Sequence, residues 1–278
     1  MESARQSGTP FYFVAQESHV GYDRLVNEDS IGVFNTPNGE LFIVADGLSG
    51  QAGGGVASRL AMNAFHKHLL EENGDPAELM RQAVARANEA VIEAGELYPE
   101  LQGLGSTLVA LLLRNNEAWY INVGDSRLYL SSASGFRRLT RGGIGSSKTE
   151  ERKEEGPPPQ TLGGEVNLAS LVPGRHCYKA DDTFLLSTSG LQALMDDKEI
   201  KEILGRQASP EERAMALIET AVLAGGSDNL SVQVVAFKPG PEEEDDRAGP
   251  AWLSGRKGFF LGLLGGLLAG AGLMYWLT

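Results

Sequence analysis

The chain has 278 residues and 42% of them are hydrophobic, which is enough for one large domain with a packed core and a tail. Its formal net charge of −13 argues against nucleic acid as the main partner, because duplex binding requires lysine and arginine to neutralise phosphates. The one cysteine, Cys177, cannot form an internal disulfide, which is typical of a reducing compartment, and we interpret it as a small core residue.

The first part of the chain has the pattern of strands followed by two helices. Apolar or alternating runs predict strands at residues 11–15, 30–34 and 41–45. Apolar and small residues then recur at helical spacing, and Asp75-Pro76 is typical of the N-cap and first residue of a second helix. Strands are predicted again at residues 107–113, 118–123 and 127–131.

The second part repeats this order after a polar segment. Residues 142–159 are charged and proline-rich, and we expect them to form a mobile loop. Strands are predicted at 184–186 and 230–237, with helices between them at 189–195, 198–204 and 210–224. Two groups of strands, each followed by helices, predict an α+β protein with two sheets face to face and helices outside.

The C-terminal segment has a different composition. Residues 258–278 contain no charged residue, and about 20 residues at 1.5 Å each span a bilayer core, so we expect one transmembrane helix. A buried core helix is the alternative, but an acidic, proline-containing linker at 239–257 separates this segment from the domain at 10–238. Arg256 and Lys257 precede the apolar run, which predicts that the domain at 10–238 lies in the cytoplasm on a single-pass anchor in the cytoplasmic membrane. Gly262 and Gly266 belong to a stripe of small residues that predicts a homodimer.

Acidic residues recur at the predicted ends of strands. Asp46, Asp125 and Asp228 lie at such ends, and Glu28 and Asp29 precede another strand. Strand-end carboxylates can converge at one edge of a sheet, and oxygen ligands are those that Mg and Mn prefer. Each acid taken alone is equally typical of a solvated turn or a helix cap.

Six segments in chain order resemble the motifs of PPM-type metal-dependent protein Ser/Thr phosphatases, the protein phosphatase 2C family. The resemblance extends from about Tyr12 to Phe237, and the chain is similar to the bacterial branch of the family. The segments that carry it lie at residues 18–30, 44–50, 105–109, 123–129, 185–191 and 227–231.

The resemblance implies an α-β-β-α sandwich of two mainly antiparallel sheets, and hydrolysis of phosphoserine or phosphothreonine in proteins. Water activated by two Mn or Mg ions would attack the phosphorus, with a third ion in some members. The resemblance also implies phosphorylated proteins and a cognate Ser/Thr kinase system as partners. It assigns roles to residues at the matching positions: Asp46 bridges the ions, the Gly47 carbonyl and Asp228 each bind one, Glu28 and Asp29 hold waters, Asp125 helps to hold the third ion, and Arg24 binds the phosphate.

One position departs from the family pattern in a way that affects function. The family has Ser-Asp-Gly where this chain has Thr188-Ser189-Gly190, so Ser189 replaces a metal-ligand aspartate. A neutral hydroxyl is a far weaker ligand for a hard dication. Two functions therefore remain open: an active, weakened phosphatase, or a pseudophosphatase that serves as a membrane-tethered phosphoprotein-binding or regulatory scaffold. The glycines at 50–55 lack the lysine of a P-loop, which argues against nucleotide binding.

Overall fold

The computed structural model describes residues 11–48, 53–140, 160–164 and 166–238. The predicted loop at 142–159, the linker at 239–257 and the predicted transmembrane helix at 258–278 lie outside these residues. Among the described residues, no helix has both the length and the apolar composition needed to span a bilayer.

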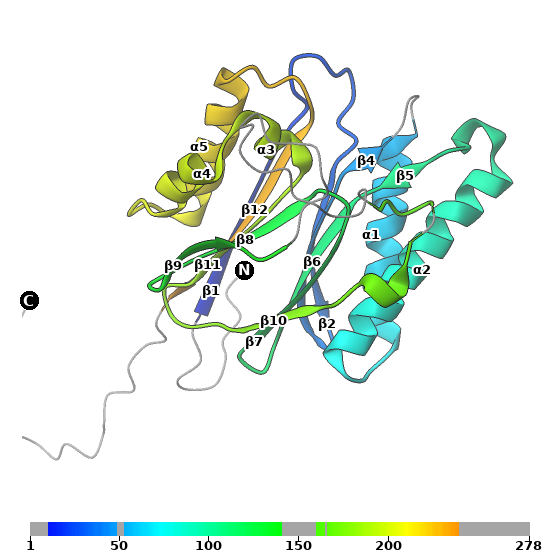
Figure 1. Ribbon diagram of the computed structural model, residues 1–278, viewed down its shortest axis with the longest axis horizontal. Coiled ribbons are helices and arrows are strands. Elements are labelled where there is room, and N and C mark those ends of the chain that lie inside the picture. Colours follow the sequence, from blue (N-terminus) through cyan, green and yellow to red (C-terminus); the bar gives the residue numbers. More distant parts are fainter. Residues whose placement is uncertain (1–10, 49–52, 141–159, 165, 239–278) are drawn as a thin grey trace, which may run out of the picture. The chain divides into compact units, whose positions relative to one another are not determined.

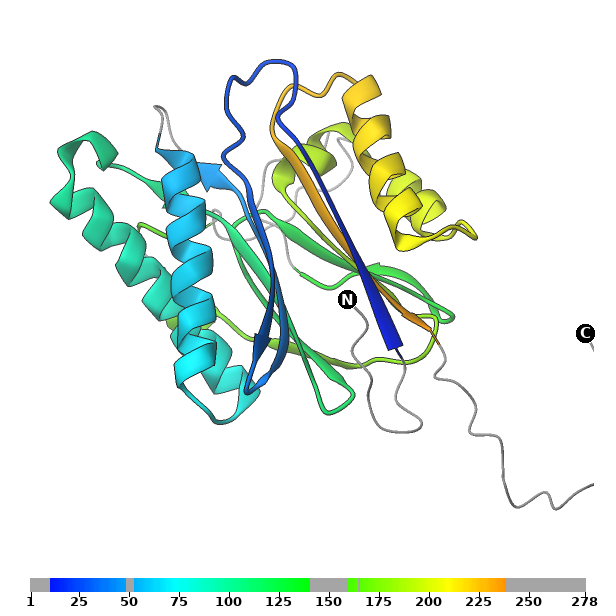
Figure 2. The same ribbon diagram turned by 180° about the vertical axis from the view of Figure 1, so that it is seen from behind.

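Two five-stranded antiparallel sheets pack against each other (Figures 1 and 2). The first sheet contains, in spatial order, β1 (Phe11–His19), β12 (Leu230–Lys238), β11 (Thr183–Ser187), β8 (Arg127–Ser132) and β9 (Gly135–Arg138). The second contains β10 (Gly174–Cys177), β7 (Glu117–Val123), β6 (Leu108–Arg114), β3 (Gly39–Ala45) and β2 (Ser30–Thr36). A short pair, β4 (Gly47–Leu48) and β5 (Gly105–Ser106), extends beyond the end of the second sheet.

Helices cover the outer face of each sheet, as both ribbon views show. On the second sheet lie α1 (Gly54–Glu71) and α2 (Pro76–Leu97). On the first sheet lie α3 (Ser189–Leu194), α4 (Asp197–Leu204) and α5 (Pro210–Leu223). Single turns of 3-10 helix occur at Pro99–Leu101 and Leu168–Ser170.

The hydrophobic core has three layers, one between the sheets and one under each helix group. Because the central strands are covered on both faces, their sequences are continuously apolar rather than alternating. Residues Leu41 to Ala45 of β3 are all fully buried, with Phe42 and Val44 facing the other sheet and Leu41 and Ile43 facing the helices. This central layer fixes the strand ends on which the site is built.

The predicted α+β fold with two antiparallel sheets flanked by helices is confirmed. The Asp75 side chain accepts a hydrogen bond from Glu78 N at 3.1 Å and Pro76 is the first helical residue, as predicted. The sequence analysis missed β9 and β10, because both are short, largely exposed edge strands with little apolar signal. The interpretation of Cys177 as a core residue is wrong, because it lies exposed at the end of β10.

Candidate metal centre

One cavity gathers most of the predicted site residues. Its volume is about 410 Å³, and it lies where strands of both sheets end. Its lining consists of Arg24, Glu28, Asp46, Gly47, Leu48, Gly103, Ser189, Asp228 and Asn229. Asp29 and Asp125 are not part of this lining, but both raise the pKa of Asp46 by charge repulsion, so they lie close behind it.

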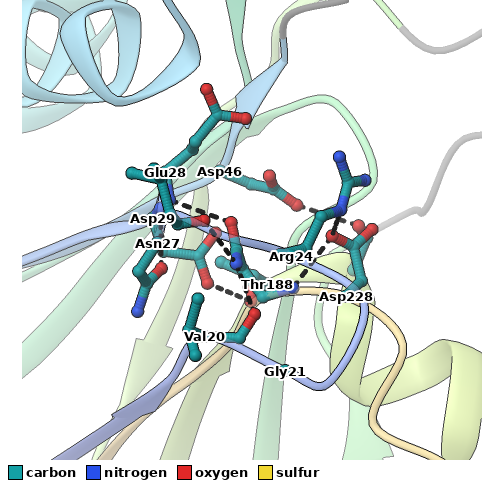
Figure 3. A network of polar contacts seen from close by, with 12 residues as sticks. Val20, Gly21, Arg24, Asn27, Glu28, Asp29, Asp46, Thr188 and Asp228 are labelled. Carbon is teal, nitrogen blue, oxygen red and sulfur yellow. Dashed lines mark hydrogen bonds and ion pairs between the residues drawn. The ribbon is translucent and has the colours of Figure 1, made fainter. Parts of the chain in front are cut away.

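Asp46 is held at the junction of β3 and β4 by its own backbone. Its N–H donates to Thr107 Oγ1 at 3.0 Å and its carbonyl accepts from Thr107 N at 2.8 Å. The Thr107 hydroxyl is fixed in turn by Ser126 Oγ at 2.7 Å. Gly47 follows, and a Cβ there would lie 2.1 Å from the carbonyl oxygen of Gly54. The close approach of α1 therefore requires glycine, and it leaves the Asp46 side chain directed into the cavity (Figure 3).

The carboxylates of Asp29 and Asp46 are buried close together and repel each other. Burial raises the pKa of Asp46 to about 8, and the charge of Asp29 adds to the effect. Burial likewise raises the pKa of Asp29 to about 6, against hydrogen bonds that favour its ionised form. Burial also raises the pKa of Asp125. A cation bound between these groups would stabilise their ionised forms and so offset the effect of burial.

Asp29 has one oxygen that the protein leaves unsatisfied. Its Oδ2 accepts from Thr188 Oγ1 at 3.0 Å, and that hydroxyl accepts from Ser231 N at 3.0 Å. Its Oδ1 is buried and has no hydrogen-bond partner among the described residues. A buried carboxylate oxygen without a donor costs free energy unless a cation or an ordered water satisfies it. The donor set and this orphaned oxygen therefore fit a hard divalent cation.

The described residues contain no group of three or more His, Cys, Asp or Glu side chains gathered tightly enough to hold a metal ion by themselves. This finding is compatible with the implied ligand set, in which Gly47 acts through its carbonyl and Glu28 and Asp29 act through water. In the structure the Glu28 side chain is already engaged, because Oε1 accepts from Gly54 N at 2.9 Å in the first turn of α1.

Arg24 lines the same cavity as Asp46 and pairs with Asp228. Its Nε is 2.8 Å from Asp228 Oδ1, and both side chains are about half exposed, at 47% and 45%. The hydrogen bond to Asp228 raises the pKa of Arg24, so the guanidinium stays charged. Figure 3 shows the guanidinium above Asp228 at the loop that joins β1 to β2. A charged, half-exposed guanidinium beside a cavity can accept a phosphate in two-pronged geometry.

Asn229 has a structural role that the sequence analysis did not assign. Its amide Nδ2 donates to the carbonyls of Val20 at 2.7 Å and Val26 at 3.1 Å, and its Oδ1 accepts from Glu28 N at 2.9 Å. One buried side chain therefore fixes the β1–β2 loop that carries Arg24 and Glu28. The signal was present in the segment at 227–231, where only the aspartate had been given a function.

Ser189 lies where the resemblance places it, beside Asp46. It is the first residue of α3, it lines the cavity, and its Oγ donates to Asp46 Oδ2 at 2.9 Å. The hydroxyl therefore contacts the carboxylate to which the resemblance assigns the bridging role.

Comparisons with known proteins agree with the motifs. The protein phosphatase 2C family model matches residues 16–220. The serine/threonine phosphatase stp of Listeria welshimeri is 30% identical over 228 residues, which cover 75% of this chain and 89% of that relative. The serine/threonine protein phosphatase PstP of Mycobacterium tuberculosis is 32% identical over 79% of this chain and 44% of its own length.

A solved structure places metal ions in a similar fold. The catalytic domain of the serine/threonine protein phosphatase PstP, crystallised in complex with two manganese ions, superposes with a TM-score of 0.70. It is 30% identical, and the match covers 83% of this chain and all of that one. The predicted enzyme class is confirmed, and the chain belongs to the protein phosphatase 2C family.

Proposed function

We propose that this chain hydrolyses phosphoserine and phosphothreonine in proteins at a site for two Mn or Mg ions. The observation that carries the proposal is one cavity with a deeper and an outer half. Asp46 lines the deeper half, with Asp29 close behind it, and burial raises the pKa of both carboxyl groups. The outer half presents the charged Arg24. The names of the relatives, serine/threonine phosphatases, support the reaction, and the two manganese ions of PstP support the cofactor.

The residues divide the work by charge. Asp46 would bridge both ions, with the Gly47 carbonyl on one and Asp228 on the other, while Glu28 and Asp29 would hold bound waters and Asp125 would help with a third ion. When bound, the ions supply positive charge and acidify the water that attacks phosphorus. Arg24 would bind and orient the phosphate with its fork of donors, and its half-exposed guanidinium pairs with Asp228 at 2.8 Å. Phosphorylated proteins and a cognate Ser/Thr kinase system are the partners that this reaction requires.

Ser189 supports a second candidate function. Its hydroxyl donates to Asp46 Oδ2, so one oxygen of the bridging carboxylate is engaged by a neutral group instead of sharing an ion with a second acid. An ion site weakened in this way fits an enzyme that needs high metal concentrations. It also fits a pseudophosphatase that binds phosphoproteins through Arg24 as a membrane-tethered scaffold. We favour the enzyme, because Glu28, Asp46 and Asp228 line the cavity and Asp29 and Asp125 lie close behind Asp46.

The test is hydrolysis of a phosphothreonine peptide, followed by phosphate release, with Mn added from micromolar to millimolar concentrations and then removed with EDTA. We expect activity that appears with Mn and disappears with the chelator. Activity that persists in excess EDTA would contradict the metal mechanism. A folded protein that binds the phosphopeptide but releases no phosphate at any Mn concentration would favour the scaffold.

We further propose that residues 258–278 anchor the chain in the cytoplasmic membrane with the catalytic domain in the cytoplasm. The proposal is supported by the absence of charge across this segment and by Arg256 and Lys257 before it. Gly262 and Gly266 support dimer formation through close helix packing. Deleting residues 251–278 should release the protein from the membrane fraction. A full-length chain found in the soluble fraction without detergent would contradict the anchor. Unchanged crosslinking after leucine substitution of both glycines would contradict the dimer.

A further inference from the structure

Three apolar side chains are exposed on the loop that carries Arg24. Tyr22, Leu25 and Val26, on the loop between β1 and β2, are 67%, 101% and 65% exposed. We call these three residues the apolar rim. Single exposed apolar residues are common on proteins, but three within five consecutive residues next to a functional cavity indicate a binding surface. Arg24, which lines the cavity, lies within the same five residues.

The loop is held firmly, so its exposed side chains have a defined position. Tyr22 N donates to Gly226 O at 2.6 Å, and the Asn229 amide binds the carbonyls of Val20 and Val26 on both sides of Arg24. At Gly21 φ is +84°, and a Cβ would lie 2.3 Å from the carbonyl oxygen of Asp228. The backbone therefore packs directly on the turn before β12, which Figures 1 and 2 show beside the loop. An ordered surface loses little conformational entropy when it binds.

We propose that the apolar rim binds apolar residues next to the phosphorylated serine or threonine of an extended substrate segment. This inference rests on the proposed function, in which Arg24 takes the phosphate. An extended chain advances about 3.3–3.6 Å per residue, so side chains next to a phosphate at Arg24 reach its neighbours in the loop. The surrounding carboxylates of Asp23, Glu28 and Asp228 disfavour acidic residues at these positions.

A lipid surface is the other kind of partner that exposed apolar side chains can bind. The observations favour the phosphoprotein, because Asp23 stands within the rim and the chain carries a net charge of −13. The rim residues also flank Arg24, which lines the cavity in which the phosphate would lie.

The test compares Leu25→Ser with the wild-type full chain, in detergent and with Mn. Leu25 is fully exposed, so the fold does not depend on its side chain. Three substrates are used: p-nitrophenyl phosphate, and two phosphothreonine peptides that differ only in having leucine or serine on both sides of the phosphothreonine. We expect wild type to prefer the leucine peptide and Leu25→Ser to lower kcat/KM for it about tenfold, the value of burying one such side chain.

Two properties should stay unchanged if the rim acts as proposed. Hydrolysis of p-nitrophenyl phosphate should be the same in Leu25→Ser, because this substrate has no flanking residues. Leu25→Met should keep the peptide preference, because it keeps the apolar volume. The matched control is Val172→Ser, which removes an 83% exposed apolar side chain that does not line the cavity and should change nothing.

The remaining outcomes separate this inference from the proposed function. If all three substrates are hydrolysed with equal kcat/KM for the two peptides, the inference about the rim is overturned and the proposed phosphatase function stands. If nothing is hydrolysed, the proposed function fails. Fluorescence anisotropy of the labelled peptides then tests whether the rim binds them. Equal affinities in wild type and Leu25→Ser would overturn the inference. If Leu25→Ser instead weakens binding to phosphatidylcholine vesicles without changing the peptide ratio, lipid is the occupant and the proposal is wrong.

Discussion

The carboxylates of the outer and the deeper half of the cavity have different neighbours. Asp228 is half exposed and has a cation of the protein itself, Arg24, at 2.8 Å. Asp29 and Asp46 lie deeper, where Asp29 accepts a hydrogen bond from the Thr188 hydroxyl and Asp46 accepts one from the Ser189 hydroxyl. Burial is the main cause that raises the pKa of both deeper carboxyl groups, and neither of them has an ion pair like that of Asp228 among the described residues. This contrast indicates where a bound cation stabilises the protein most and where a phosphate can enter.

The largest effect is expected from Asp46→Asn, which removes the charge at the centre of the deeper half. Since losses around a metal site cost about 10- to 100-fold even from positions that only support the ligands, loss of the acid that we propose to bridge the ions should lower phosphopeptide hydrolysis by at least about 100-fold. Steady-state kinetics at millimolar Mn measures this. Asp181→Asn is the matched control, because Asp181 is an exposed turn residue outside the cavity. Equal losses in both variants would contradict a specific role for Asp46.

Ser189→Asp should sharpen the contrast by restoring a carboxylate next to Asp46. We expect the Mn concentration for half-activation to fall about 10- to 100-fold, which corresponds to roughly 1.4 to 2.7 kcal/mol. A Mn titration of phosphopeptide hydrolysis measures the shift, with Ser189→Ala as the control that removes the hydroxyl without adding charge. If wild type is fully active at micromolar Mn and Ser189→Asp is no better, then Ser189 does not replace a ligand.

Arg24→Lys tests the outer half. Lysine keeps the positive charge but loses the planar fork, so we expect KM for a phosphopeptide to rise about tenfold, while the Mn concentration for half-activation changes little. Measuring both quantities on the same preparation separates the two halves. A shift in Mn half-activation as large as the change in KM would mean that Arg24 acts through Asp228 and not on the phosphate.

The last prediction concerns the pH dependence of stability. Without metal, Asp29 and Asp46 have folded-state pKa values of about 6 and 8, above the ordinary value of 3.8. The unfolded chain therefore loses these protons first, and the unfolding free energy should fall as pH rises from about 4 to 8. In EDTA, calorimetry should show a lower Tm at pH 8 than at pH 5, with a smaller difference in Asp46→Asn. A pH dependence identical in wild type and Asp46→Asn would show that Asp46 does not titrate in this range.

The sequence predicted the elements that are strongly apolar and the acids that follow them. The central strands and α1 to α5 were recognisable because continuous apolar runs and helical spacing are local signals. Edge strands β9 and β10 were not, since their pairing depends on neighbours distant in sequence. The same reason hid the Asn229 amide, which joins segments about 200 residues apart. The depth of Asp29 and the pairing of Arg24 with Asp228 arise only when both sheets are assembled.

Calorimetric titration of Mn into the chelator-treated full chain at pH 8 tests most directly whether the deeper carboxylates hold a cation. Wild type and Asp181→Asn should bind Mn saturably, Asp46→Asn should lose that binding, and wild type should bind less tightly at pH 5 because protons compete for Asp29 and Asp46. No binding by wild type at millimolar Mn, or equal binding by wild type and Asp46→Asn, would contradict a metal centre at this end of the sandwich.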